Sequence, residues 1–177
     1  MVNALDLSFN AFTSSIQSPV LTKIMIAITS AGDIATIFPL SVILIAFLIY
    51  LKKFQHGVIA SLSLIIGLSS SEVLKRVIGR SRPSDALMFL RDHSFPSGHA
   101  IISTIFFCLL YYIYQDNIKD KLYKKLFLAF CIAMPILISF SRLYLNVHWL
   151  TDVIAGMLIG IFWAALFIKI DKQVAQR

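Results

Sequence analysis

Five long apolar runs constrain the fold of this chain more than any other feature. They cover residues 34–51, 57–74, 97–115, 122–141 and 149–168. Each run approaches the roughly 20 residues that a helix needs to cross about 30 Å of hydrocarbon. In lipid, every backbone polar group must find its hydrogen bond within the protein, which helices achieve by themselves. The sequence therefore predicts an all-α integral-membrane helical bundle.

The N-terminal region adds a shorter apolar segment. Residues 19–31 are apolar but short for a full crossing, and residues 1–18 are more polar. Within 1–18, Leu5, Phe9 and Phe12 recur at helical spacing among polar residues, a pattern typical of a helix lying in the membrane interface. We expect an interfacial N-terminal helix, and five or six transmembrane helices depending on whether 19–31 crosses fully.

Composition supports a membrane protein and argues against a nucleic-acid partner. The chain is 58% hydrophobic and only 14% charged, with a mean hydropathy of +0.82, far from the soluble norm. Its net charge of +7 comes from short basic clusters at the ends of apolar runs, not from an extended basic surface. We expect residues 1–177 to form a single membrane-embedded domain in contact with the bilayer, and composition leaves its oligomeric state open.

The basic clusters predict the orientation in the membrane. They are Lys52 and Lys53, then Lys119, Lys121, Lys124 and Lys125, and finally Lys169, Lys172 and Arg177. Alternating helices bring all three clusters to one face, and loops rich in Lys and Arg stay in the cytoplasm. We therefore expect a protein of the cytoplasmic (inner) membrane with a cytoplasmic C-terminus. The connections 79–95 and 142–148 should then face the periplasm or the cell exterior.

Ionisable residues gather at that opposite face. Lys75 ends one predicted helix, His99 lies near the start of the next, and His148 and Asp152 begin the last. Such groups are costly in a membrane, so their grouping indicates function. His148 and Asp152 are four residues apart and share a helix face, where a carboxylate can hold one imidazole nitrogen and leave the other as a nucleophile or metal ligand. A simple helix-start pair stabilised by the macrodipole is the alternative.

The tetrapeptide PSGH at 96–99 opens a predicted helix beside these residues. Free N–H groups at a helix start, together with the Ser97 hydroxyl, make an anion site. Taken alone, the tetrapeptide is also an ordinary helix start. Lys75, Arg82 and Arg142 bring cations to the same face, and arginine suits the capture of phosphate oxygens.

The spacing of these residues completes three motifs. They are Lys75 followed by six residues and Arg82-Pro83, then the tetrapeptide 96–99, then Ser141-Arg142, five residues, His148, three residues and Asp152. Over residues 75–152 the chain resembles the type 2 phosphatidic acid phosphatase family. These membrane lipid phosphatases share an active-site design with vanadium haloperoxidases, and the resemblance also implies a helical membrane frame.

The resemblance implies a role for each motif residue. His148 would attack phosphorus to form a phosphohistidine, Asp152 would hold and polarise its ring, and His99 would act as general acid. The residues implied to bind phosphoryl oxygens are Lys75, Arg82, Ser97, Gly98 and Arg142. With these fixed cations the reaction requires no metal or other cofactor. Arg80 is a further candidate for headgroup contact, although a solvated loop arginine explains it equally well.

The expected activity is hydrolysis of a lipid phosphate. Family members act on undecaprenyl diphosphate, phosphatidylglycerol phosphate, phosphatidic acid or the 1-phosphate of lipid A, and motifs common to all four do not select one. A membrane transporter of anions or lipids is an alternative, but the ionisable residues gather at one mouth instead of lining a path. A second alternative is a non-catalytic lipid-binding relative. The presence of His148, Asp152 and His99 argues against it.

Overall fold

The computed structural model describes residues 2–176, and all regular secondary structure within them is helical. The helices are α1 (Ala4–Ser15), α2 (Pro19–Ser30), α3 (Ile34–Tyr50), α4 (Phe54–Ile78), α5 (Gly98–Tyr114), α6 (Lys121–Tyr144) and α7 (Leu150–Ala175), with a 3-10 turn at Gln115–Asn117. Met1 and Arg177, the last residue of the third basic cluster, lie outside the described residues.

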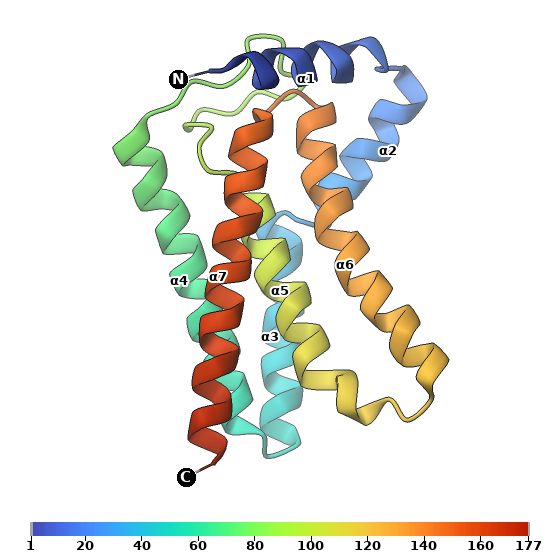
Figure 1. Cartoon of the computed structure of the whole chain (residues 1–177), viewed down its shortest axis with the longest axis vertical. Coiled ribbons are helices and arrows are strands. Elements are labelled where there is room, and N and C mark those ends of the chain that lie inside the picture. The colour runs from blue at the N-terminus through green and yellow to red at the C-terminus, as the bar shows by residue number, and fades with distance from the viewer. Residues whose placement is uncertain (1, 177) are drawn as a thin grey trace.

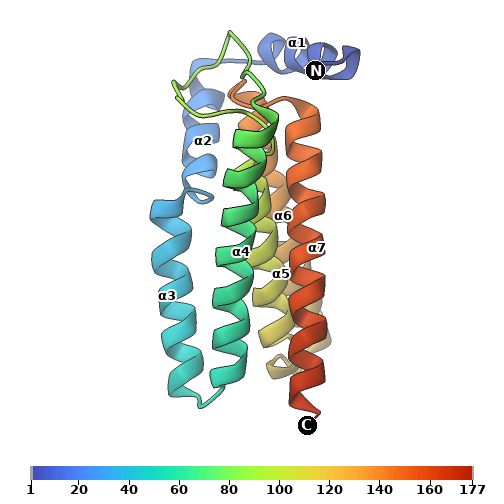
Figure 2. The same ribbon diagram turned by 90° about the vertical axis from the view of Figure 1, so that its left-hand side faces the viewer.

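Five helical segments are long and apolar enough to cross a membrane, which confirms the predicted bundle. The first of them, Pro19–Tyr50, contains both α2 and α3, and α2 continues above α3 in the same column (Figure 2). The apolar stretch 19–31 is therefore the upper half of the first span, and not a separate sixth one. Helix α1 lies across one end of the bundle, as an interfacial helix should (Figure 1).

The two ends of the bundle differ in the residues they carry. Figure 1 shows residues 79–97 and the α6–α7 turn at the same end as α1, which we call the motif end. The α3–α4 turn, the α5–α6 connection and the end of α7 lie at the other end, which carries the lysines of the three basic clusters and which we call the lysine end. The spans thus alternate in direction and bring the lysines of the basic clusters to one end, as expected from the sequence.

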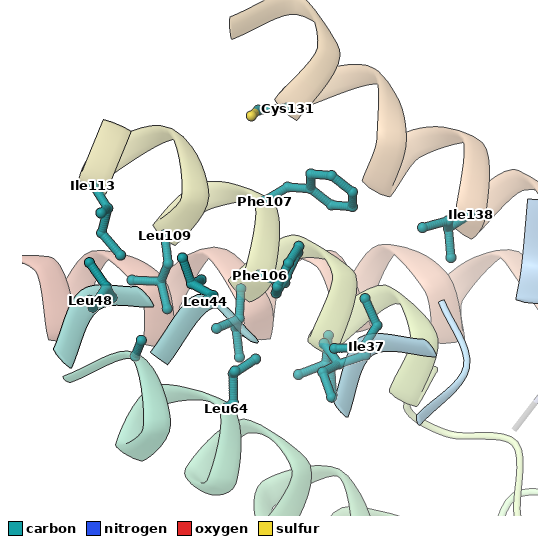
Figure 3. Packing of buried hydrophobic residues seen from close by; sticks show 14 residues of the cluster. Ile37, Leu44, Leu48, Leu64, Phe106, Phe107, Leu109, Ile113, Cys131 and Ile138 are labelled. Atoms are coloured by element: carbon teal, nitrogen blue, oxygen red, sulfur yellow. The ribbon is translucent and has the colours of Figure 1, made fainter. Parts of the chain in front are cut away.

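Helix α5 forms the centre of the bundle and contacts α3, α4, α6 and α7. Its buried apolar side chains meet those of the neighbouring helices in one cluster that includes Ile37, Leu64 and Ile138 (Figure 3). Lipid tails are as apolar as these side chains, so moving a side chain out of lipid gives no hydrophobic gain. Close van der Waals packing between the helices holds the spans together instead.

Two glycines allow α7 to pack directly on α5. A Cβ atom at Gly156 would lie 2.7 Å from the carbonyl oxygen of Ser97, and one at Gly160 would lie 2.7 Å from Cβ of Thr104. Small residues at helix interfaces let the backbones of membrane helices approach closely. This packing fixes the start of α5 against the first half of α7.

Local sequence sets the helix ends that carry the motifs. Helix α4 ends at Gly79, whose φ of 61° is in the left-handed region that glycine adopts without a steric cost. Ser97 caps α5, since its Oγ accepts a hydrogen bond from the Ala100 amide. These two ends place Lys75 in the last turn of α4 and His99 in the first turn of α5.

Candidate active site

A polar cavity of about 230 Å³ opens at the motif end. Its lining comes from the α2–α3 turn, the start of α3, α4, the 79–97 connection, α5 and the α6–α7 region, and it includes Lys75, Arg82, Gly98, His99, Arg142 and His148. These residues span 74 positions of the sequence, from 75 to 148 inclusive. Helix packing therefore brings all three motifs into one cavity.

His148 is buried, and its two ring nitrogens have different surroundings. Nδ1 lies 2.7 Å from the carbonyl oxygen of Ser94, and Nε2 lies 3.2 Å from Nη1 of Arg82. A carbonyl oxygen only accepts, so Nδ1 carries the proton and Nε2 keeps its lone pair. Burial and, to a smaller extent, the nearby arginines lower the pKa of His148 to about 3. Asp152 raises this pKa but does not offset burial. The imidazole is thus neutral at physiological pH.

Asp152 is also buried, but a different group holds its carboxylate. Its Oδ1 accepts from Arg80 at 2.5 Å, and its Oδ2 accepts from the Trp149 amide at 2.9 Å. Oδ2 lies 3.6 Å from Nδ1 of His148, farther than the Ser94 carbonyl. Asp152 therefore acts on the imidazole as a nearby negative charge, while the Ser94 carbonyl holds the ring.

Arg80 lies outside the residues that line the cavity, contrary to the role of headgroup contact considered from the sequence. Its guanidinium joins Asp152 to Asp6 of α1, with 2.5 Å to each carboxylate, and also donates to Thr151. Asp6 in turn accepts from the Thr151 amide at 2.9 Å. Burial by itself raises the pKa of Asp6, but hydrogen bonds from Thr151, Arg80 and Asn3 outweigh it and lower that pKa. Helix α1 is thereby fastened to the start of α7.

His99 has a partner that the sequence motifs do not contain. Its Nε2 lies 2.7 Å from Oδ1 of Asp33, which precedes α3 and makes no side-chain cap hydrogen bond to that helix. An aspartate at a helix start usually caps that helix. The absence of a cap is visible only in the structure, so no sequence pattern indicated that Asp33 pairs with His99.

Asp92 is a second residue that the sequence motifs do not include. Its carboxylate lies between two of the motif cations. Oδ2 is 2.6 Å from Nζ of Lys75, and Oδ1 is 2.7 Å from Nη2 of Arg82. Burial raises the pKa of Asp92, but hydrogen bonds from both cations outweigh it and hold that pKa far below its usual value. A phosphate that binds both cations must displace this carboxylate.

The remaining motif residues differ in the hydrogen bonds that they make within the protein. Arg142 is buried and donates to Thr29 at 2.8 Å, while its Nε has no hydrogen-bond partner anywhere in residues 2–176. Arg142 can therefore donate to a ligand in the cavity. The Ser97 amide donates to the Asp152 carbonyl at 3.1 Å and its hydroxyl caps α5, so Ser97 is engaged in holding the helix start. Gly98, next to it, lines the cavity.

Comparison with known proteins agrees with the family resemblance seen in the sequence. The PAP2 superfamily model matches residues 56–175. Phosphatidylglycerophosphatase B of Bacillus subtilis (strain 168) is 28% identical over 175 residues, covering 98% of this chain and 86% of the relative. An undecaprenyl-diphosphatase of Sulfolobus acidocaldarius is 30% identical over 164 residues, covering 88% of this chain and 73% of the relative.

The solved structures include a close match to the whole fold. The crystal structure of a transmembrane PAP2 type phosphatidylglycerolphosphate phosphatase from Bacillus subtilis superposes with a TM-score of 0.88 at 28% identity. The match covers 98% of this chain and 89% of that one. The likeness therefore extends over the N-terminal helices as well as the motifs.

Proposed function

The chain belongs to the PAP2 superfamily, and from this premise we propose that it is a membrane phosphatase that removes phosphate from a lipid headgroup through a phosphohistidine intermediate. One observation carries the proposal. Three cations, Lys75, Arg82 and Arg142, and two imidazoles, His99 and His148, line a single cavity at the ends of membrane-spanning helices. Fixed cations around a nucleophile stabilise the charge that spreads over phosphoryl oxygens in the transition state.

We assign the first chemical step to His148. Its Nε2 lone pair attacks phosphorus, and the bond from phosphorus to the leaving oxygen breaks as the new N–P bond forms. His99 is an imidazolium in this step: its Nε2–H stays hydrogen-bonded to Asp33, and its Nδ1 proton passes to the leaving oxygen, which departs with the lipid. The neutral state of His148 supports this role, because a protonated imidazole has no lone pair to donate.

The second step releases the phosphate. A water molecule attacks the phosphohistidine while His99 takes up the water proton, so that the N–P bond breaks and both histidines regain their starting states. Arg142 and the Gly98 amide hold the phosphoryl oxygens, and Lys75 and Arg82 join them once Asp92 is displaced. This assignment gives charge stabilisation to the protein itself, so we propose that turnover needs no metal ion.

An apolar groove next to the cavity supports a lipid substrate. It has a volume of about 290 Å³ and lies between α3 and α4. Three residues, Ile34, Leu68 and Ile102, line both the groove and the polar cavity. A lipid can therefore place its phosphate among the cations while its tail runs from the same opening along the two helices.

The proposed substrate is a class of lipids and not a single lipid. The two relatives named above are called a phosphatidylglycerophosphatase and an undecaprenyl-diphosphatase. We propose a phosphomonoester or diphosphate headgroup of one of four lipids: phosphatidylglycerol phosphate, undecaprenyl diphosphate, phosphatidic acid or lipid A 1-phosphate. The cavity and groove suit the chemistry that all four share, which is a phosphate at the end of a long apolar tail.

We further propose that the motif end faces the periplasm or cell exterior and the lysine end faces the cytoplasm, as the distribution of Lys and Arg favours. The protein then lies in the cytoplasmic membrane with its C-terminus inside. Ser84→Cys should react with an impermeant maleimide added to intact cells, whereas Lys121→Cys should react only after the cells are opened. The reverse pattern contradicts this orientation.

Turnover by purified protein tests the chemistry. We expect phosphate release from at least one of the four lipids in the presence of EDTA, inhibition by vanadate, and loss of turnover in His148→Ala. His93→Ala removes an exposed histidine of the same region and is the control that should stay active. An active His148→Ala protein contradicts the phosphohistidine mechanism, and activity that EDTA abolishes contradicts metal independence.

A further inference from the structure

Ser71 presents a buried hydroxyl to the polar cavity. The residue is 1% exposed and lines the cavity, and its Oγ has no hydrogen-bond partner anywhere in residues 2–176. A buried polar group without a partner is unfavourable, so native proteins rarely keep one without a reason. None of the three motifs contains Ser71.

The hydroxyl of a helical serine normally has a partner close by. A buried or half-buried serine can donate to the carbonyl three or four residues earlier in its own helix. In this chain Ser41, Ser61, Ser70 and Ser103 all do so, at 2.6 to 2.8 Å. Ser71 follows Ser70 directly in α4 but makes no such bond, which leaves its donor available to a molecule in the cavity.

The position of Ser71 is that of a phosphate ligand. It precedes Lys75 by four residues and so lies one turn away on the same face of α4. A Cβ atom built on Gly98 would lie 3.4 Å from Oγ of Ser71 and 3.9 Å from Nζ of Lys75. The hydroxyl and the ammonium therefore flank the same side of Gly98, where the PSGH tetrapeptide opens α5.

We propose that Ser71 is a further substrate-binding residue, whose hydroxyl donates a hydrogen bond to a phosphoryl oxygen beside Lys75. This inference rests on the proposed function, because it assumes that phosphate occupies the cavity. Three other buried hydroxyls lack partners within residues 2–176, at Ser63, Thr104 and Ser139. These three are not among the lining residues of the cavity, which separates Ser71 from them.

Phosphate binding by purified full-length protein tests the inference without relying on turnover. Affinity for inorganic phosphate and for vanadate is measured from the rise in melting temperature with ligand concentration. We expect Ser71→Ala to weaken both affinities by roughly tenfold, as expected for the loss of a hydrogen bond to a charged group. Its melting temperature without ligand should be no lower than that of the wild type, since the hydroxyl has no hydrogen bond within residues 2–176 to lose.

Ser63→Ala is the matched control, because Ser63 lies in the same helix and is also buried with an unpartnered hydroxyl. It should bind phosphate and vanadate like the wild type. Unchanged affinity in Ser71→Ala, or an equal loss in Ser63→Ala, overturns the role of Ser71 and leaves the proposed function standing. Wild-type protein that binds phosphate but hydrolyses no lipid phosphate overturns the proposed function instead, while the comparison of variants still decides on Ser71.

Discussion

The Asp33 carboxylate lies 2.7 Å from Nε2 of His99 and connects the start of α3 to the start of α5. The carboxylate only accepts, so Nε2–H donates the hydrogen bond to Asp33, which sets the orientation of the ring and leaves Nδ1 as the nitrogen that exchanges a proton with the substrate. Asp33 is thus a positioning residue for the proposed general acid.

We expect Asp33→Asn to lower kcat by roughly 10- to 100-fold, because a misoriented acid loses much of the benefit of proton transfer. The KM should change much less, since no phosphate contact is removed. Steady-state kinetics with a water-soluble lipid phosphate measure both constants. A change confined to KM contradicts this role for Asp33.

Removing the Asp92 carboxylate should strengthen phosphate binding. In Asp92→Asn, Lys75 and Arg82 lose the anion that pairs with them, so phosphate no longer competes with it. We expect the inhibition constant of inorganic phosphate to fall by roughly 3- to 10-fold, the scale of a partly exposed ion pair. Asp116→Asn removes an exposed carboxylate at the lysine end and should leave this constant unchanged. Weaker inhibition in Asp92→Asn contradicts the prediction.

His148 should make stability depend on pH. Folding lowers its pKa from 6.5 to about 3, so between these values the unfolded chain binds more protons than the folded one. Its contribution to stability is complete above pH 6.5 and is lost as the pH falls toward 3, by at most about 1.4 kcal/mol per pH unit. Melting temperatures between pH 7 and 4.5 should therefore fall more steeply for the wild type than for His148→Asn. Parallel curves count against a neutral buried imidazole.

The link between α1 and the site should be essential for stability. Asp6→Asn removes the Asp6 carboxylate from a buried arrangement in which Arg80 also pairs with Asp152, and breaking a buried pair costs about 3–5 kcal/mol. Denaturation in detergent should show this loss together with reduced activity. Asp116→Asn breaks the exposed pair with Lys124 and should cost at most about 1 kcal/mol. Similar losses in both variants contradict a special role for Asp6.

The close contact between α7 and α5 gives a further test. Gly156→Ala places a methyl group 2.7 Å from the Ser97 carbonyl oxygen, so the helices must move apart and the start of α5 must shift. We expect lower thermal stability and lower kcat. Gly57→Ala is the control, because its nearest contact would be an ordinary 3.8 Å, and the higher helix propensity of alanine should make it neutral or stabilising. Equal thermal stability and equal kcat in the two variants argue against the close approach of Gly156 to Ser97.

Much of the fold followed from short-range sequence patterns. The apolar runs predicted the spans, and helices α3 and α5 begin and end within a residue of the predicted limits. Helices α4 and α7 extend several residues beyond the apolar runs, because a helix does not end where it leaves the hydrocarbon. Whether residues 19–31 form a separate span could be decided only from the structure, because the stacking of α2 on α3 makes them part of the first span.

The motif spacing also predicted which residues gather at one end of the bundle, but it did not identify the hydrogen-bond partners of those residues. Lys75, His99 and His148 line one cavity, in agreement with their expected location at one end of the bundle. The sequence suggested Asp152 as the partner of the His148 ring, yet the Ser94 carbonyl is the nearer group. Asp33 was not considered at all.

The features of this protein therefore divide into those that the local sequence determines and those that depend on helix packing. The sequence by itself determined which segments enter the membrane and which residues share a helix face, because hydrophobicity and the helical repeat act over a few residues. Only the tertiary structure decided which distant groups pair, such as Asp6 with Arg80 or Asp33 with His99. Those pairs depend on how the helices pack, and packing depends on contacts such as that of Gly156 with Ser97, which no local pattern specifies.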